Sequence, residues 1–140
     1  MGSEMSRIAP TVLVIFLAGC AAPGGVRIYD GPPRARSEVA ILKGGTRDYW
    51  QAAFFRVALT ATSNAPSVCN ARDSCPTKVY ILPGRYLIGL RCTRGISRGQ
   101  TSMTLDARPG MTYEIGCQAS PTVADTLSAY VVPSLSSDDD

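Results

Sequence analysis

Cysteine offers the widest choice of chemistry in this 140-residue chain, which contains five cysteines and no histidine. Cysteine thiolates bind zinc, exchange disulfides or oxidise to stable bridges, depending on their spacing and their compartment. Cys69 and Cys75 have a C-x5-C spacing, which is not that of a zinc ribbon, and the chain has no C-x-x-C motif. A four-cysteine zinc site and a redox-active pair are therefore the weaker alternatives, and structural disulfides are favoured.

The absence of histidine removes the commonest general base and metal ligand, and with it the Ser-His and Cys-His nucleophiles. No G-x-S-x-G, P-loop or dinucleotide-binding motif is present. An envelope enzyme stays an alternative only if two acids converge in one pocket. The candidate acids are scattered along the chain: Asp30, Glu38, Asp48, Asp73, Asp106, Glu114 and Asp125. We therefore predict a protein that is not an enzyme and has no catalytic residue, metal or cofactor.

The N-terminus has the three parts of a secretory signal peptide. Arg7 precedes an apolar run over residues 8–17, and the small residues Ala18 and Gly19 follow it. The run is well short of the roughly 20 residues that cross a bilayer core, so a permanent membrane span is the weaker interpretation. We expect residues 1–19 to be removed on export, whether translation starts at Met1 or Met5.

The junction Leu17-Ala18-Gly19-Cys20 resembles the lipobox of bacterial lipoproteins. The resemblance implies that Cys20 is diacylated and becomes the first residue of the mature chain, and two acyl chains are enough for stable anchoring. Ala21, in place of an aspartate, implies the outer membrane of a Gram-negative cell, on the periplasmic face unless a further system exports the protein to the surface. The alternative is an ordinary secretory signal with a chance cysteine.

Four cysteines remain for an oxidising compartment, and strand parity favours one pairing. Residues 86–92 and 111–117 alternate apolar and polar side chains, which places Cys92 and Cys117 on the core faces of two strands. We predict a buried Cys92–Cys117 bridge between strands and a local Cys69–Cys75 clip on a loop. Loop closure gives the first about 3.5 kcal/mol and the second about 2.4 kcal/mol.

Turn residues divide the mature chain into a tether, a domain and a tail. Residues 20–37 are rich in proline and glycine and predict a flexible lipidated tether, and residues 134–140 predict a disordered acidic tail. Residues 38–133 predict an all-β domain, a small antiparallel β-sandwich with two disulfides. Pro83-Gly84 should join two strands in a tight bend or hairpin, and Pro109-Gly110 should turn the chain again. The expected strands cover residues 38–42, 53–62, 78–82, 85–93, 101–107, 111–117 and 127–132.

A second resemblance rests on short motifs spread over the mature chain. Tyr29-Asp30-Gly31-Pro32-Pro33-Arg34 precedes the strand candidate, and Leu82-Pro83-Gly84-Arg85-Tyr86 joins two later ones. These motifs resemble those of poorly characterised proteobacterial lipoproteins. The resemblance implies a small β-sandwich, similar to carboxypeptidase-regulatory or PEGA domains, and it supplies no catalytic residue.

Two groups of side chains are candidates for binding. Arg91, Arg94 and Arg98 flank a glycine-containing loop, where guanidinium groups suit phosphate or carboxylate, although a solvated turn is the plainer interpretation. Tyr49 and Trp50 could contact a partner, unless the single tryptophan lies in the core.

The main functional hypothesis is an accessory or scaffolding lipoprotein with an envelope protein partner. The alternative is a module that binds an anionic envelope component, lipopolysaccharide or peptidoglycan, through the basic loop. A net charge of +3 is too modest to indicate a nucleic-acid partner.

Overall fold

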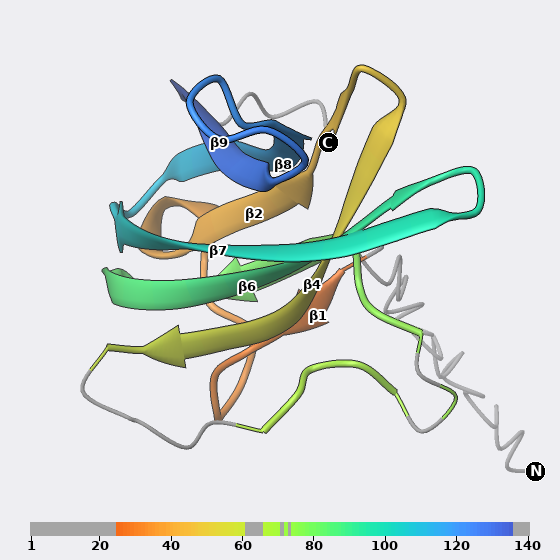
Figure 1. Ribbon diagram of the computed structural model, residues 1–140. Coiled ribbons are helices and arrows are strands. Elements are labelled where there is room, and N and C mark those ends of the chain that lie inside the picture. Colours follow the sequence, from red (N-terminus) through yellow and green to blue (C-terminus); the bar gives the residue numbers. More distant parts are fainter. Residues whose placement is uncertain (1–24, 61–65, 71, 73, 136–140) are drawn as a thin grey trace, which may run out of the picture.

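The computed structural model describes residues 25–60, 66–70, 72 and 74–135, which form two β-sheets packed face to face (Figure 1). The first sheet has five strands in the order β1-β5-β2-β8-β9, and the second has four in the order β3-β4-β6-β7. The predicted all-β sandwich is confirmed, although it is not purely antiparallel. β1 pairs with β5 in parallel, and β2 pairs with β8 in parallel.

The strand bounds show which parts of the chain each sheet uses. The five-stranded sheet contains β1 (Val26–Arg27), β5 (Lys78–Ile81), β2 (Ala40–Gly44), β8 (Met111–Ala119) and β9 (Leu127–Leu135). The four-stranded sheet contains β3 (Thr46–Arg47), β4 (Trp50–Leu59), β6 (Gly84–Arg94) and β7 (Ser97–Ala107). A short 3-10 helix, η1 (Arg36–Glu38), precedes β2.

Alternating side chains of both sheets fill the space between them, as expected for strands with one buried face. On β6 the even-numbered residues from Tyr86 to Cys92 are buried, whereas Arg85, Leu87 and Thr93 face outward and are wholly or partly exposed. The largest fully buried side chains are Phe54, Ile41, Leu42, Ile81, Ile88, Leu90 and Ile115. This parity sends the odd-numbered side chains of β6 to the outer face of the four-stranded sheet.

Both predicted disulfides are present. Cys92 on β6 and Cys117 on β8 are fully buried, and their bond joins the two sheets across the core. Cys69 and Cys75 close a loop between β4 and β5. Strand parity therefore identified the correct pairing, because a bridge between the two sheets needs one inward-facing cysteine on each.

β4 does not keep the regular inward and outward alternation of side chains that the sequence suggests over residues 53–62, and its first half has the opposite faces. In the sequence of the expected strand 53–62, Ala53, Phe55 and Val57 alternate with polar and apolar neighbours as one face would, but β4 ends at Leu59 and buries Phe54 and Val57. Residues 61–62 of that prediction lie outside the described part of the chain. A register shift between Phe54 and Arg56 inserts one extra residue, a β-bulge, which reverses the alternation. Phe55 consequently lies on the outer face, with its ring against Gly89.

The two Pro-Gly turns move the chain between sheets and do not close hairpins. Pro83-Gly84 connects β5 of one sheet to β6 of the other, and Pro109-Gly110 connects β7 to β8 in the same way. Gly110 has φ of +74°, a left-handed conformation that glycine adopts without steric cost. The bend predicted at Pro83-Gly84 exists, but the hairpin alternative is wrong there, and the hairpin of this region is β6–β7 with Gly95 and Ile96 at its tip.

The sandwich extends into both flanking segments. Val26–Arg27 forms β1 within the predicted tether of residues 20–37, and the Ile28 amide donates a hydrogen bond of 2.9 Å to the Tyr80 carbonyl. At the other end β9 continues to Leu135, past the predicted strand end at 132 and into the predicted tail. Residues 1–24, with the expected signal peptide and Cys20, and residues 136–140 lie outside the described part of the chain.

Candidate functional site

The main candidate site is a concavity of about 700 Å³ on the outer face of the four-stranded sheet. Its walls are Arg72, Arg91, Thr93, Arg98, Gly99 and Gln100, and we call it the arginine concavity. Register places Thr93 opposite Arg98 and Arg91 opposite Gln100 on the paired strands β6 and β7. Side chains that face each other across two strands lie about 5 Å apart at Cβ, so one small group can contact several of them.

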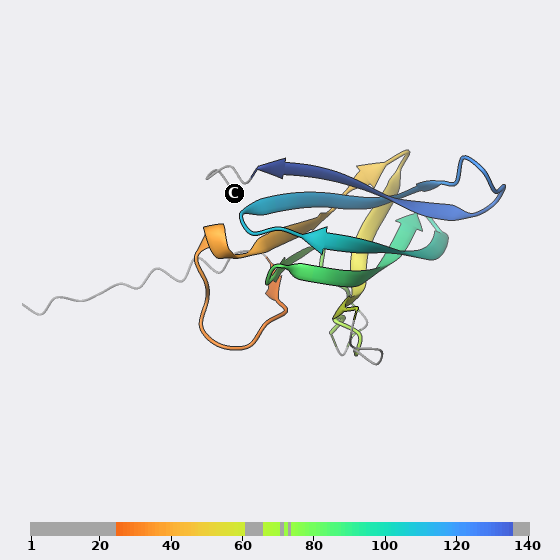
Figure 2. The ribbon, with the colours of Figure 1, turned by 90° about the vertical axis from the view of Figure 1, so that its left-hand side faces the viewer.

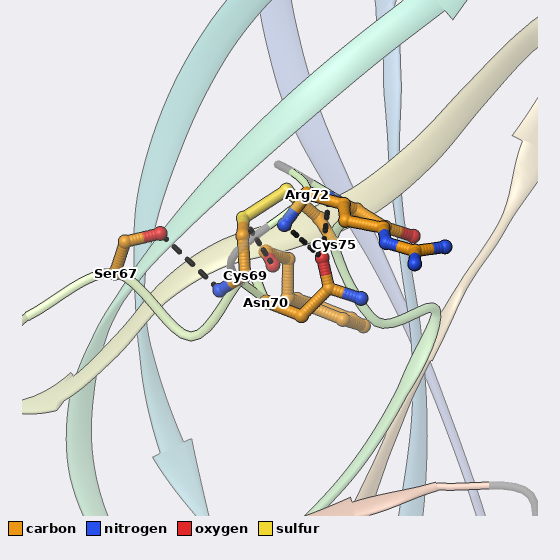
Figure 3. The surroundings of a disulfide bond; sticks show 7 residues. Ser67, Cys69, Asn70, Arg72 and Cys75 are labelled. Atoms are coloured by element: carbon orange, nitrogen blue, oxygen red, sulfur yellow. Dashed lines mark hydrogen bonds between the residues drawn. A yellow bond between two sulfur atoms is a disulfide. The ribbon is translucent and has the colours of Figure 1, made fainter.

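A disulfide-closed loop presents the third arginine of the concavity. The Asn70 side-chain oxygen accepts hydrogen bonds of 3.0 Å from the amides of both Arg72 and Ser74, and the Asn70 amide donates to the Ser74 carbonyl at 2.9 Å (Figure 3). The Cys69–Cys75 bond holds the two ends of this turn together. The disulfide and these hydrogen bonds together fix the loop conformation that presents Arg72.

The same loop is fixed to the edge of β4. The Phe54 amide donates to the Pro76 carbonyl at 2.8 Å, and the Val68 amide donates to the Phe55 carbonyl at 2.9 Å. Residues on both sides of the disulfide are thus anchored to the strand that neighbours β6. These bonds bring the loop beside Arg91, which also lines a smaller hollow with Cys75.

The chemistry of the arginine concavity suits an oxyanion. Three guanidinium groups offer planar, charged donors that match phosphate and carboxylate oxygens, and the Thr93 hydroxyl and Gln100 amide can add neutral hydrogen bonds. Among the described residues, its lining includes no aspartate or glutamate. The arrangement is suited to binding a group of this kind.

The three arginines that the sequence suggested as one binding group, Arg91, Arg94 and Arg98, do not all line the same concavity. Arg91 and Arg98 both line the concavity, but Arg94 has the parity of the inward face of β6. Its guanidinium carbon lies 4.6 Å from the centre of the Trp50 ring, within the range of a cation–π contact. Arg72 takes the third place instead. Sequence reasoning missed Arg72 because only the long-range docking of the loop on β4 brings it to β6.

A second concavity of about 590 Å³ lies between the start of β7 and the loop that joins β8 to β9. Arg94 and Arg98 lie on one side of it and Asp125 on the other, and Trp50 and Leu127 also contribute to its lining. Its charge is mixed, so it favours no single class of ligand. Arg98 is shared by the two hollows, because it stands at the free edge of the sheet.

Tyr49 and Trp50 have opposite environments and do not form a joint contact surface. Trp50 is only 8% exposed and belongs to the core, as the plainer of the two interpretations expected. Tyr49 is 87% exposed at the tip of the β3–β4 hairpin. Asp48 and Tyr49 both have positive φ, 50° and 64°, as in a type I′ turn, a conformation that is costly for a bulky side chain. Tyr49 alone of the pair is available to a partner.

Residues 25–60, 66–70, 72 and 74–135 contain no group of three or more residues able to hold a metal ion. In the same residues no helix has both the length and the apolar character to cross a membrane. The arginine concavity is therefore the site with the clearest chemistry.

Comparison of the chain with protein-family models, with curated proteins and with solved structures finds no match.

Proposed function

We propose that the protein is a non-enzymatic lipoprotein of the outer membrane whose sandwich binds an anionic envelope component through the arginine concavity. The single observation that carries the proposal is the convergence of Arg72, Arg91 and Arg98 around one hollow. The ligand chemistry that this site recognises is a phosphate or carboxylate group. Lipopolysaccharide supplies the first and peptidoglycan supplies the second.

The location in this proposal rests on the residues before the sandwich. The Leu17-Ala18-Gly19-Cys20 junction gives the protein its lipid, and Ala21 favours the outer membrane. Two disulfides agree with a compartment that oxidises thiols. A lipid-anchored module that reaches the periplasm meets anionic head groups and cell-wall polymers at high local concentration.

The test compares retention of the purified full-length protein on immobilised lipopolysaccharide and on peptidoglycan sacculi. The double variant R72A/R91A should lose most of its retention on one of the two materials, since a charge-assisted hydrogen bond contributes about 1.5–3 kcal/mol. R94A is the matched control, because Arg94 points to the other side of the sheet and should leave retention unchanged. Equal retention of the wild type and of R72A/R91A on both materials would reject the proposal.

A second candidate function is docking to an envelope protein, as an accessory or scaffolding component. The observation that favours it is Tyr49, a large aromatic side chain held almost fully exposed in a left-handed backbone conformation. Strained residues of this kind gather at functional sites. A photo-crosslinking amino acid at position 49 should capture one defined protein in intact cells, and the same probe at exposed Leu87 on β6 should not.

A further inference from the structure

The edges of the two sheets are protected unequally. β1 and β3 are only two residues long, β9 carries Pro133, and part of the β4 edge is covered by the loop described above. Short strands, proline and covering loops are the usual means of preventing edge-to-edge pairing. Among the described residues, β7 has none of these features. It is eleven residues long, contains no proline or lysine, and pairs with β6 without a register break. Figures 1 and 2 show it as a long strand beside β6.

Backbone geometry determines which residues of β7 can accept another strand. The Phe54 amide donates a hydrogen bond to the Pro76 carbonyl in the loop, on the side of β4 away from β6. Phe54 and Leu90 are therefore a non-hydrogen-bonded pair, and the Leu90 amide points toward β7. Antiparallel pairing then turns Thr101, opposite Leu90, toward β6, and the residues on either side of it turn their amides outward. The residues with outward amides are Arg98, Gln100, Ser102, Thr104 and Asp106, and all five are exposed.

The sequence of β7 is complementary to itself when two copies run antiparallel. Ser102 is the middle residue of Ser97–Ala107, so a twofold axis at Ser102 lets all eleven residues pair with the same strand of a second chain. This register places Arg98 of each chain opposite Asp106 of the other, and Gln100 opposite Thr104. Opposite charges that face each other across strands are stabilising. A shift of two residues in either direction shortens the pairing and separates Arg98 from Asp106.

We propose that the protein forms a homodimer by antiparallel pairing of β7 with β7 of a second copy, centred on Ser102. The two four-stranded sheets then join into one continuous sheet with an isologous interface. The partner is the same chain because the longest possible pairing and the charge match fall in a single register. Arg98 contributes both to this interface and to the arginine concavity, whereas Asp106 belongs only to the interface.

Cysteine crosslinking tests the register directly. In the full-length chain in membranes, S102C places two cysteines opposite each other, with Cα atoms about 5.5 Å apart, within the range of a disulfide. A mild oxidant should convert S102C to a dimer on a non-reducing gel. T104C is the matched control, because two copies of residue 104 would lie about 14 Å apart in this register. A monomeric S102C, equal crosslinking by T104C, or capture of a different protein by S102C would overturn the proposal.

Charge reversal provides an independent measurement by sedimentation of the detergent-solubilised full chain. D106R places like charges opposite each other twice per dimer and should weaken dimerisation about tenfold or more. R98D/D106R restores both cross-chain pairs and should recover the dimer. R85A removes only the exposed partner of Asp106 within the chain, at 3.9 Å, and should leave dimerisation unchanged. Failure of the double reversal to restore D106R, with folding intact by circular dichroism, would also refute the pairing.

Discussion

Breaking the Cys92–Cys117 bridge should destabilise the sandwich more than breaking the Cys69–Cys75 clip. The first bond closes a loop with a sequence separation of 25 and the second a loop with a separation of 6. In the chain-entropy treatment these closures contribute about 3.5 and about 2.4 kcal/mol. The difference of about 1 kcal/mol is a minimum for the effect on the fold, because only the longer bridge also ties the two sheets together.

The cleanest measurement keeps both core cysteines and breaks only the bond between them. The variant C69A/C75A is unfolded in urea, reduced and refolded, so that Cys92 and Cys117 return to the core as thiols. Its free energy of unfolding is then compared with that of the same variant in the oxidised form. We expect a loss of about 3.5 kcal/mol, which for a domain of this size lowers Tm by about 15 °C. The native oxidised protein should resist the reductant, because both cysteines are fully buried.

Two outcomes would refute this reasoning. A loss below about 1 kcal/mol would mean that the inter-sheet bond does not restrict the unfolded chain as loop closure requires. A larger loss from C69A/C75A than from C92A/C117A would mean that the clip, and not the inter-sheet bridge, holds the sandwich together. Matching slopes of unfolding free energy against urea would show that the variants expose similar surface.

Three further measurements follow from local geometry. Tyr49→Gly should raise the free energy of unfolding by about 1 kcal/mol, because glycine adopts a positive φ without the steric cost borne by Tyr49; an unchanged urea midpoint would contradict this. Gly116→Ala should lower it by about 1–3 kcal/mol, because a Cβ at that position would overlap the Tyr130 ring, and unaltered thermal stability would show that the ring moves aside. Burial raises the pKa of the Tyr86 hydroxyl, which also donates a hydrogen bond of 2.8 Å to the Leu82 carbonyl. The unfolded chain therefore ionises first, so stability should be intact below pH about 10 and fall as pH rises through the higher folded pKa, and Tyr86→Phe should flatten that fall in pH-dependent urea titrations.

Local alternation predicted much of the core. The inward positions of Tyr86, Ile88, Leu90 and Cys92 follow from period-two patterning on a strand that is regular along its whole length. The same parity argument on 111–117 gave the correct cysteine partner. Such patterns are visible in the sequence because a strand with one buried and one exposed face alternates apolar and polar residues.

The same reasoning failed where the backbone departs from regularity or where distant segments meet. Nothing in the sequence around Phe55 marks the bulge, since a run of alanine and phenylalanine fits either face. Pro83-Gly84 gives the same turn signal whether the chain reverses in one sheet or crosses to the other. Arg72 joins the candidate site through loop bonds to β4, and residue type alone does not encode that contact.

The first strand of the sandwich has a mechanical consequence for a chain held by its N-terminal end. Traction from that end acts first on β1, which the Val26–Arg27 pairing and the Ile28 amide hold to β5, while the Ile28 side chain packs against the core. Release of this segment frees the stretch from residue 25 to 35, which spans about 35 Å in total when fully extended, while the inter-sheet disulfide stays closed. If lipid on Cys20 holds the N-terminal end, as proposed above, stretching this segment changes the distance that the domain reaches from the membrane without unfolding the core.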